Sequence, residues 1–149
     1  MASGNGNRRI HMSLPCTLDL LGVVDKVIEG ITERMEFEDT DRDAIAISVI
    51  EASTNAIQHG HAEDGTAQYQ IDFEMAENKL IILVHDRGTG FEPDMSSDLT
   101  PPDLLSTRGR GIFIMRSMMD EVSFDFTNGT LVRLVKNRSE SEGGGEADA

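Results

Sequence analysis

The chain has 149 residues and a formal net charge of -14 at pH 7, with 13 Lys and Arg against 27 Asp and Glu. This length suits one domain with its own core, so a single site is expected. The composition argues against a nucleic-acid ligand, because neutralising phosphates needs a basic face. There is no run of about 18 apolar residues, so we expect no membrane span. A single cysteine, Cys16, excludes an internal disulfide and favours a reducing, cytoplasmic location.

Two polar tails flank the predicted domain. Residues 1–8 are mostly small or polar, and residues 139–149, SESEGGGEADA, combine glycine with four acidic side chains. Neither tail has an apolar stretch to bury. We therefore predict disordered tails at 1–8 and 139–149, and one folded domain at 9–138.

The first half of the chain predicts one strand followed by two helices. RIHMSLPC reads as a short strand closed by Pro15. Residues 17–37 show helical periodicity, with Thr17 as a plausible N-cap and an apolar stripe that includes Val27 and Ile31. An acidic connection then leads to a second helix at about 41–59.

The second half predicts most of a sheet. Residues 67–75 and 78–86 read as paired strands, and a polar stretch at 88–108 is long enough to be a lid or binding loop. A short helix at 111–121 and strands at 122–126 and 130–136 follow. The predicted fold class is α+β, a two-layer α/β sandwich in which a mixed sheet carries its helices on one face.

A narrow polar strip interrupts the second helix, which is otherwise apolar over most of its girth. Glu51, Asn55 and His59 follow one another at a spacing of four, which places them within about 80° on one side. These polar groups are better suited to hold a ligand or metal than only to face solvent. The alternative is a solvated face with chance spacing.

Two glycine-containing stretches supply further candidate sites. Asp86 ends a strongly apolar strand and is followed by Gly88 and Gly90, so a carboxylate there could accept a hydrogen bond from an exocyclic amine such as that of adenine. Taken alone, this pattern also fits an ordinary turn at a strand end.

The second stretch, RGRGIFIM, interleaves Arg108 and Arg110 with Gly109 and Gly111 ahead of the predicted third helix. Backbone N–H groups at a helix start and two guanidinium groups make a natural phosphate site, and the alternative is a simple helix entry. In their order along the chain, the helix strip, the Asp-Gly-Gly stretch and this one describe a nucleotide pocket from three sides.

These motifs resemble the GHKL ATPase superfamily, and specifically the anti-sigma-factor serine/threonine kinases of the RsbW and SpoIIAB type. EASTNAIQHG resembles the N box, DRGTGF the first glycine box and GRGIFIMRSMMDEV the second. The similarity extends from Ser13 to Lys136. It implies the Bergerat fold.

The resemblance also implies roles for individual residues. Glu51 would be the general base that takes the proton from the attacking hydroxyl, and Asn55 would bind the Mg²⁺ that bridges the ATP phosphates. Asp86, with help from Thr130, would recognise adenine, and His59 would shape the pocket or merely cap its helix. The remaining implied ATP contacts are Gly88, Gly90, Arg108, Gly109, Arg110 and Gly111.

By the same resemblance, the chain is expected to be a Mg-ATP-dependent protein kinase that phosphorylates a STAS-domain anti-anti-sigma protein, sequesters a sigma factor and forms a homodimer. Asp25 departs from the pattern, because a basic residue is expected near the partner surface. Charge reversal at an interface weakens the sigma-factor expectation. The alternative function is a non-catalytic, ATP-gated module that traps a partner without phosphorylating it.

Overall fold

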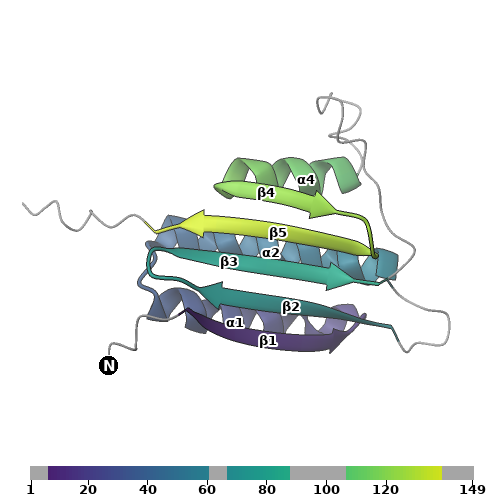
Figure 1. Ribbon diagram of the computed structural model, residues 1–149, viewed down its shortest axis with the longest axis horizontal. Coiled ribbons are helices and arrows are strands. Elements are labelled where there is room, and N and C mark those ends of the chain that lie inside the picture. The colour runs from purple at the N-terminus through teal and green to yellow at the C-terminus, as the bar shows by residue number, and fades with distance from the viewer. Residues whose placement is uncertain (1–6, 61–66, 88–106, 139–149) are drawn as a thin grey trace, which may run out of the picture.

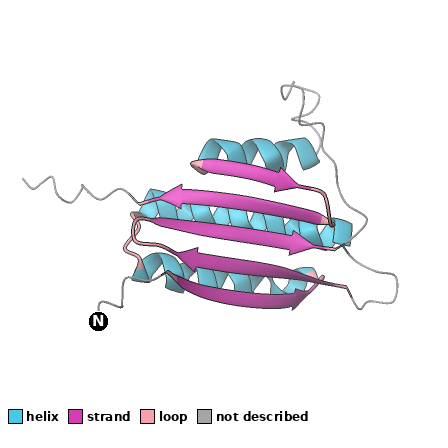
Figure 2. Ribbon diagram, in the orientation of Figure 1, coloured by secondary structure: helices cyan, strands magenta, loops and turns pink. Residues whose placement is uncertain are grey.

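The computed structural model describes residues 7–60, 67–87 and 107–138. Their strands form a five-stranded sheet with the order β1-β2-β3-β5-β4 (Figure 1). All the described helices lie on one face of this sheet (Figures 1 and 2). The sandwich of two layers is therefore confirmed. The elements are β1 (Arg8–Pro15), a 3₁₀ helix (Leu18–Leu20), α1 (Leu21–Arg34), α2 (Asp39–Gly60), β2 (Gln68–Met75), β3 (Lys79–Asp86), α4 (Thr107–Met118), β4 (Glu121–Asp125) and β5 (Thr130–Asn137).

The sheet differs from the expected mixed sheet in one respect, because every described strand pair is antiparallel. Among the described residues, the helix α4 follows β3 and precedes β4 in the chain, and these two strands run in the same direction. However, β5 lies between them and pairs antiparallel with both. The parallel relation that a β-α-β connection favours is therefore present, but between strands that are not neighbours.

The core lies between the sheet and the helices. On β2 and β3 every second side chain is buried, which follows from the alternation of side chains along a strand. Phe73, Ile82, Ile28 and Ile45 are among the fully buried side chains, and each such burial contributes roughly 1.5–3 kcal/mol. Within the described residues no helix is long and apolar enough to cross a membrane.

Several boundaries differ from the sequence prediction by a few residues. The first helix begins as a 3₁₀ turn, and Thr17 occupies its N-cap position without a capping hydrogen bond from its side chain. Its α-helical part ends at Arg34, and Glu36 then adopts a positive φ of 63°. The folded part begins slightly earlier than residue 9, since Asn7 Nδ2 donates to Glu74 Oε2 at 2.8 Å.

The helix α4, which the sequence predicts as its third helix, shows the largest boundary difference. It begins at Thr107, so Gly109 and Gly111 lie within its first turns and not ahead of it. Residues 88–106, which make up nearly all of the predicted lid, lie outside the described residues. The same holds for residues 1–6 and 139–149, so the predicted disorder of the tails stays a prediction.

Gly129, in the turn between β4 and β5, fixes how β5 meets the end of β3. Its φ is +78°, and a Cβ atom there would lie 2.0 Å from the backbone oxygen of Asp86. We expect Gly129→Ala to lower the free energy of unfolding by about 2 kcal/mol or more, because it adds left-handed strain to a backbone clash. Urea denaturation measures this change.

Gly22→Ala is the matched control for that substitution. Gly22 lies in α1, and a Cβ atom there would meet nothing within 4 Å. Alanine is the better helix former, so this variant should gain about 0.5–1 kcal/mol. A Gly129→Ala protein as stable as Gly22→Ala would contradict the assigned role of Gly129.

Candidate functional site

The polar strip of α2 faces the first turns of α4. Asn55 is buried and Glu51 is half-buried. A Cβ atom placed on Gly111 would lie 2.8 Å from Glu51 Oε1 and 3.8 Å from Asn55 Nδ2. The absence of a side chain at Gly111 therefore lets α4 approach both polar groups, and the structure brings these three predicted residues together.

Asp86 points into the layer between the sheet and the helices. It continues the buried alternation of Leu80, Ile82 and Val84 along β3, and only 3% of its surface is exposed. A carboxylate at the last inward position of an otherwise apolar strand is costly to bury without polar partners. Its register partner on β5 is Thr130, which is also buried.

A small cavity joins the two parts of the site. It has a volume of about 10 Å³, and Asn55 lines it from α2 while Asp86 and Thr130 line it from the sheet. Ala52 and Ala56, on the same side of α2, keep the helix surface above it small. The strip of α2 and the end of β3, 31 residues apart in sequence between Asn55 and Asp86, therefore meet in one place.

Tyr69 and Cys16 lie near Asp86, and the sequence analysis placed neither of them at the site. Tyr69 is the register partner of Asp86 on β2 and is 1% exposed. Burial raises the pKa of the Cys16 thiol, and the nearby Asp86 charge raises it further. This thiol therefore stays protonated at neutral pH. The alternation of buried residues along β2 is the sequence signal that could have revealed Tyr69.

Burial also raises the pKa of the Tyr69 hydroxyl above its ordinary value. The unfolded chain releases this proton at about pH 10, whereas the folded chain retains it. The resulting stability is complete below about pH 10 and is lost as the pH rises towards the higher folded pKa. Because the chain has one Tyr and no Trp, an absorbance titration of phenolate reports Tyr69 alone. Equal midpoints for native and urea-unfolded chains would contradict this expectation.

The other predicted residues are placed less completely. His59 lies in the last turn of α2 and is half-buried. Arg108, Gly109 and Arg110 lie in the first turn of α4, where backbone N–H groups have no partner within the helix and can bind an anion. The arginine side chains, and all of Gly88 and Gly90, lie outside the described residues.

The donor set suits a nucleotide with magnesium. Among the residues that the structure describes, no cluster of three His, Cys, Asp or Glu side chains could hold a metal by itself. Mg²⁺ commonly takes one or two protein oxygens and completes its shell with phosphates and water. The Asn55 amide oxygen, beside a helix start that can bind phosphates, fits this pattern.

Comparison with known proteins places the chain among ATPase-like domains. A family model described as the histidine kinase-like ATPase domain matches residues 14–136. Serine-protein kinase RsbW of Bacillus velezensis is 31% identical over 134 residues, which cover 85% of this chain and 84% of that protein. The enzyme of the same name from Bacillus subtilis is 32% identical with the same coverage.

A solved structure supports the same fold. The crystal structure of the RsbU and RsbW domains of a Mycobacterium tuberculosis protein superposes with a TM-score of 0.66 at 17% identity. The match covers 88% of this chain and 32% of that longer one. At this identity the likeness shows the fold alone.

Proposed function

Because the chain belongs to the histidine kinase-like ATPase domain family, and within it to the serine-protein kinases of the RsbW type, we propose that it transfers a phosphoryl group from ATP to a serine or threonine of a protein partner. The observation that carries this proposal is the meeting of Glu51 and Asn55 with the first turns of α4, while Asp86 and Thr130 lie below α2. This arrangement supports a base, a phosphate site and a purine site in one pocket.

Glu51 acts as the general base in this proposal. Its carboxylate accepts the proton of the partner's hydroxyl as that oxygen forms a bond to the γ-phosphorus and the bond to ADP breaks. Asn55 would hold Mg²⁺ through its amide oxygen. When bound, this ion would neutralise charge on the phosphates. The N–H groups at the start of α4, around Gly109 and Gly111, would hold the phosphates in line with the hydroxyl.

The purine end of the pocket is assigned to β3 and β5. We propose that Asp86 accepts a hydrogen bond from the adenine amine and that Thr130 assists it. The two residues are register partners on neighbouring strands and both are buried, which supports this role. Gly88, Gly90, Arg108, Arg110 and His59 complete the proposed ATP contacts. The family resemblance supports these assignments. Gly88, Gly90 and the two arginine side chains lie outside the described residues, whereas His59 is described.

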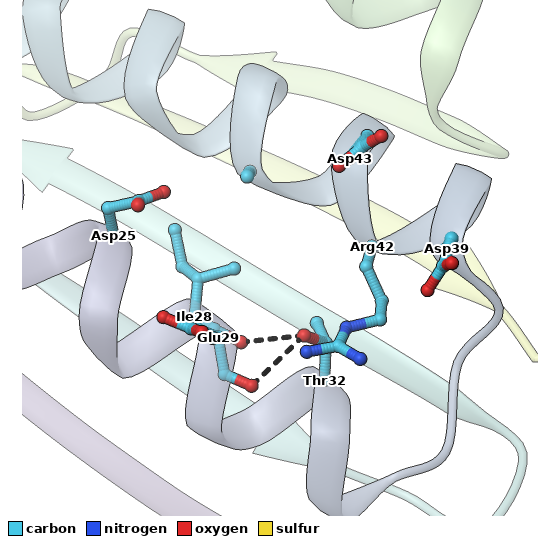
Figure 3. A pocket seen from close by; sticks show the side chains of 8 residues that line it. Asp25, Ile28, Glu29, Thr32, Asp39, Arg42 and Asp43 are labelled. Carbon is cyan, nitrogen blue, oxygen red and sulfur yellow. Dashed lines mark hydrogen bonds between the residues drawn. The ribbon is translucent and has the colours of Figure 1, made fainter.

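The proposed substrate is a STAS-domain anti-anti-sigma protein, and the proposed second partner is a sigma factor. Figure 3 shows Asp25 and Glu29 of α1 opposite Asp39, Arg42 and Asp43 of α2, around a cavity of about 520 Å³. This lining carries more negative than positive charge. A partner that contacts Asp25 should therefore present basic residues there. A bound sigma factor would then use a contact pattern unlike the one expected for relatives that carry a basic residue at this position.

We further propose, by the same resemblance, a cytoplasmic homodimer. The apolar residues that the first helix could offer to a second copy are Val27 and Ile31 of α1 and Met35 at its C-cap. However, Ile31 is 4% exposed and belongs to the core, while Val27 and Met35 pack partly against it. The apolar surface that α1 offers a second copy is therefore smaller than its stripe suggests.

The second candidate function is an ATP-gated module that traps its partner without phosphorylating it. The acidic surroundings of Asp25 favour this trapping function, because they indicate a partner surface different from that of relatives with a basic residue at this position. Both functions need the same nucleotide pocket. They differ in whether a hydroxyl of the bound partner reaches Glu51.

Intact-mass analysis separates the two candidates. A STAS-domain protein, encoded beside this chain where such a neighbour exists, is incubated with the chain and Mg-ATP. Addition of one phosphate establishes the kinase. An unchanged mass, with ATP binding demonstrated by calorimetry, would instead support the trap and make Asp25→Arg the first variant to examine for partner binding.

A further inference from the structure

His85 lies next to Asp86 at the end of β3, but its side chain points away from the nucleotide pocket. Successive side chains of a strand alternate between the two faces of its sheet, so the inward direction of Asp86 turns His85 towards the face opposite the described helices. His85 is half-buried there. It can therefore act on the pocket only through other residues.

A hydrogen bond joins His85 to the turn between β4 and β5. Its Nε2 lies 2.9 Å from the backbone oxygen of Asn128, a residue 43 positions further along the chain. Because a carbonyl oxygen only accepts, Nε2 carries the hydrogen and donates it. This turn lies beside the end of β3 (Figure 1). The hydrogen bond therefore connects two segments at the border of the proposed purine site.

Two further contacts fix the same turn. The Thr127 backbone N–H donates to Asp125 Oδ1 at 2.9 Å, which holds the pKa of this exposed carboxyl below its usual value. Gly129 lies against the backbone of β3, since a Cβ atom there would overlap the backbone oxygen of Asp86. The residue that His85 contacts lies between these two in the chain. The turn is therefore held at three consecutive residues.

The turn leads directly into Thr130, which forms the last pair of the β3–β5 register with Asp86. Both side chains are buried, and both line the small cavity that Asn55 lines from α2. A terminal pair has ladder neighbours on one side only, so strand ends open more readily than strand centres. The hydrogen bond from His85 supplies a restraint beyond this last pair.

We infer that His85 is a positioning residue for the nucleotide site. By holding the β4–β5 turn against the end of β3, it fixes Thr130 beside Asp86 in the arrangement that distinguishes the amine of adenine from a carbonyl. This inference rests on the proposed purine site, and it adds a residue that does not touch the nucleotide. The side chain acts from the opposite face of the sheet.

Two amide substitutions test the hydrogen bond itself. The side-chain nitrogen of glutamine lies as many bonds from Cβ as Nε2 of histidine, so His85→Gln can still donate to Asn128. The nitrogen of asparagine lies one bond closer to the backbone, so His85→Asn cannot reach that oxygen. Both side chains are neutral and polar, which suits a half-buried position, and both variants should fold.

Calorimetric titration of the full chain with ATP and with inosine triphosphate, each with Mg²⁺, measures the discrimination. Inosine triphosphate has a carbonyl where adenine has its amine. Loss of one hydrogen bond should weaken ATP binding about three- to tenfold in His85→Asn, and the preference for ATP should fall by a similar factor. His85→Gln should retain the affinity and the preference of the native chain.

Arg133→Ala is the matched control. Arg133 points to the same face of the sheet as His85, because its register partner is Leu83 on β3. It also joins two strands on that face, since its guanidinium donates to Glu121 Oε1 at 3.0 Å. Glu121 begins β4, at the other end of that strand from the turn. The preference for ATP should therefore be unchanged in this variant.

Hydrogen exchange without nucleotide tests the restraint separately. Backbone amides of residues 126–132 should exchange about three- to tenfold faster in His85→Asn than in the native chain or in His85→Gln. A native chain that binds neither nucleotide would overturn the proposed purine site. The exchange rates would still show whether His85 holds the turn, so the two failures can be told apart.

Two outcomes would overturn the inference. Equal weakening of ATP and inosine triphosphate binding in His85→Asn would show that the hydrogen bond supports the fold and not the recognition of the purine. Equal effects of the asparagine and glutamine substitutions would show that a donor at this position does not hold the turn.

Discussion

Glu51→Gln is expected to reduce phosphoryl transfer to the partner by about 10²- to 10⁴-fold, which is the usual contribution of a general base. The amide has the shape of the carboxylate but cannot accept the hydroxyl proton. Since Glu51 is half-buried beside Gly111, the isosteric change should not disturb the packing of α4 on α2. Intact-mass kinetics of the partner measure transfer, and calorimetry measures ATP affinity.

The matched control is Glu77→Gln. Glu77 is exposed in the turn between β2 and β3, at the opposite end of β3 from Asp86, so transfer should be unchanged. A Glu51→Gln protein that loses ATP binding and transfer equally would show that Glu51 supports the nucleotide and is not the base. Unchanged transfer would exclude it from both roles.

Asp86→Asn is expected to weaken ATP binding by about 10- to 100-fold. A hydrogen bond to a charged group is worth roughly 1.5–3 kcal/mol, and the neutral amide presents a donor as well as an acceptor to the adenine amine. Asp86 is buried next to Thr130, so water cannot readily replace the lost acceptor. Calorimetric titration with ATP measures the effect.

Inosine triphosphate makes the test of Asp86 specific. It has a carbonyl where adenine has its amine, so the native protein should bind it more weakly than ATP. Asp86→Asn should narrow or remove that difference if Asp86 recognises the amine. Asp72→Asn is the matched control, because Asp72 lies on β2 and contacts His11 at 2.7 Å away from the pocket. A variant that loses both nucleotides equally would contradict recognition of the amine.

The alternating and helical patterns predicted much of the fold. Apolar residues at every second position of residues 67–75 predicted β2, because burial of one sheet face imposes that period, and the continuous apolar run at 80–84 predicted β3. The spacing of four among Glu51, Asn55 and His59 placed them on one side of a helix, for the same local reason. The family was also readable, since its motifs are short and local.

Element ends and strand directions were less predictable. The start of α4 at Thr107 and the 3₁₀ turn before α1 depend on backbone conformations that neighbouring residues permit but do not require. The antiparallel arrangement of β3 and β5 depends on where β5 inserts. That choice is set by long-range packing and not by any segment of the sequence.

By itself, the sequence determined which side chains lie on the polar strip of α2 and that Asp86 ends an apolar strand, because these properties depend on neighbours within a few residues. The tertiary structure alone decided that Asp86 lies opposite Thr130 in the strand register and that Gly111 meets Glu51 and Asn55. These juxtapositions join residues far apart in the chain. Their physical cause is the burial of one sheet face under the helices, which brings such distant residues into contact.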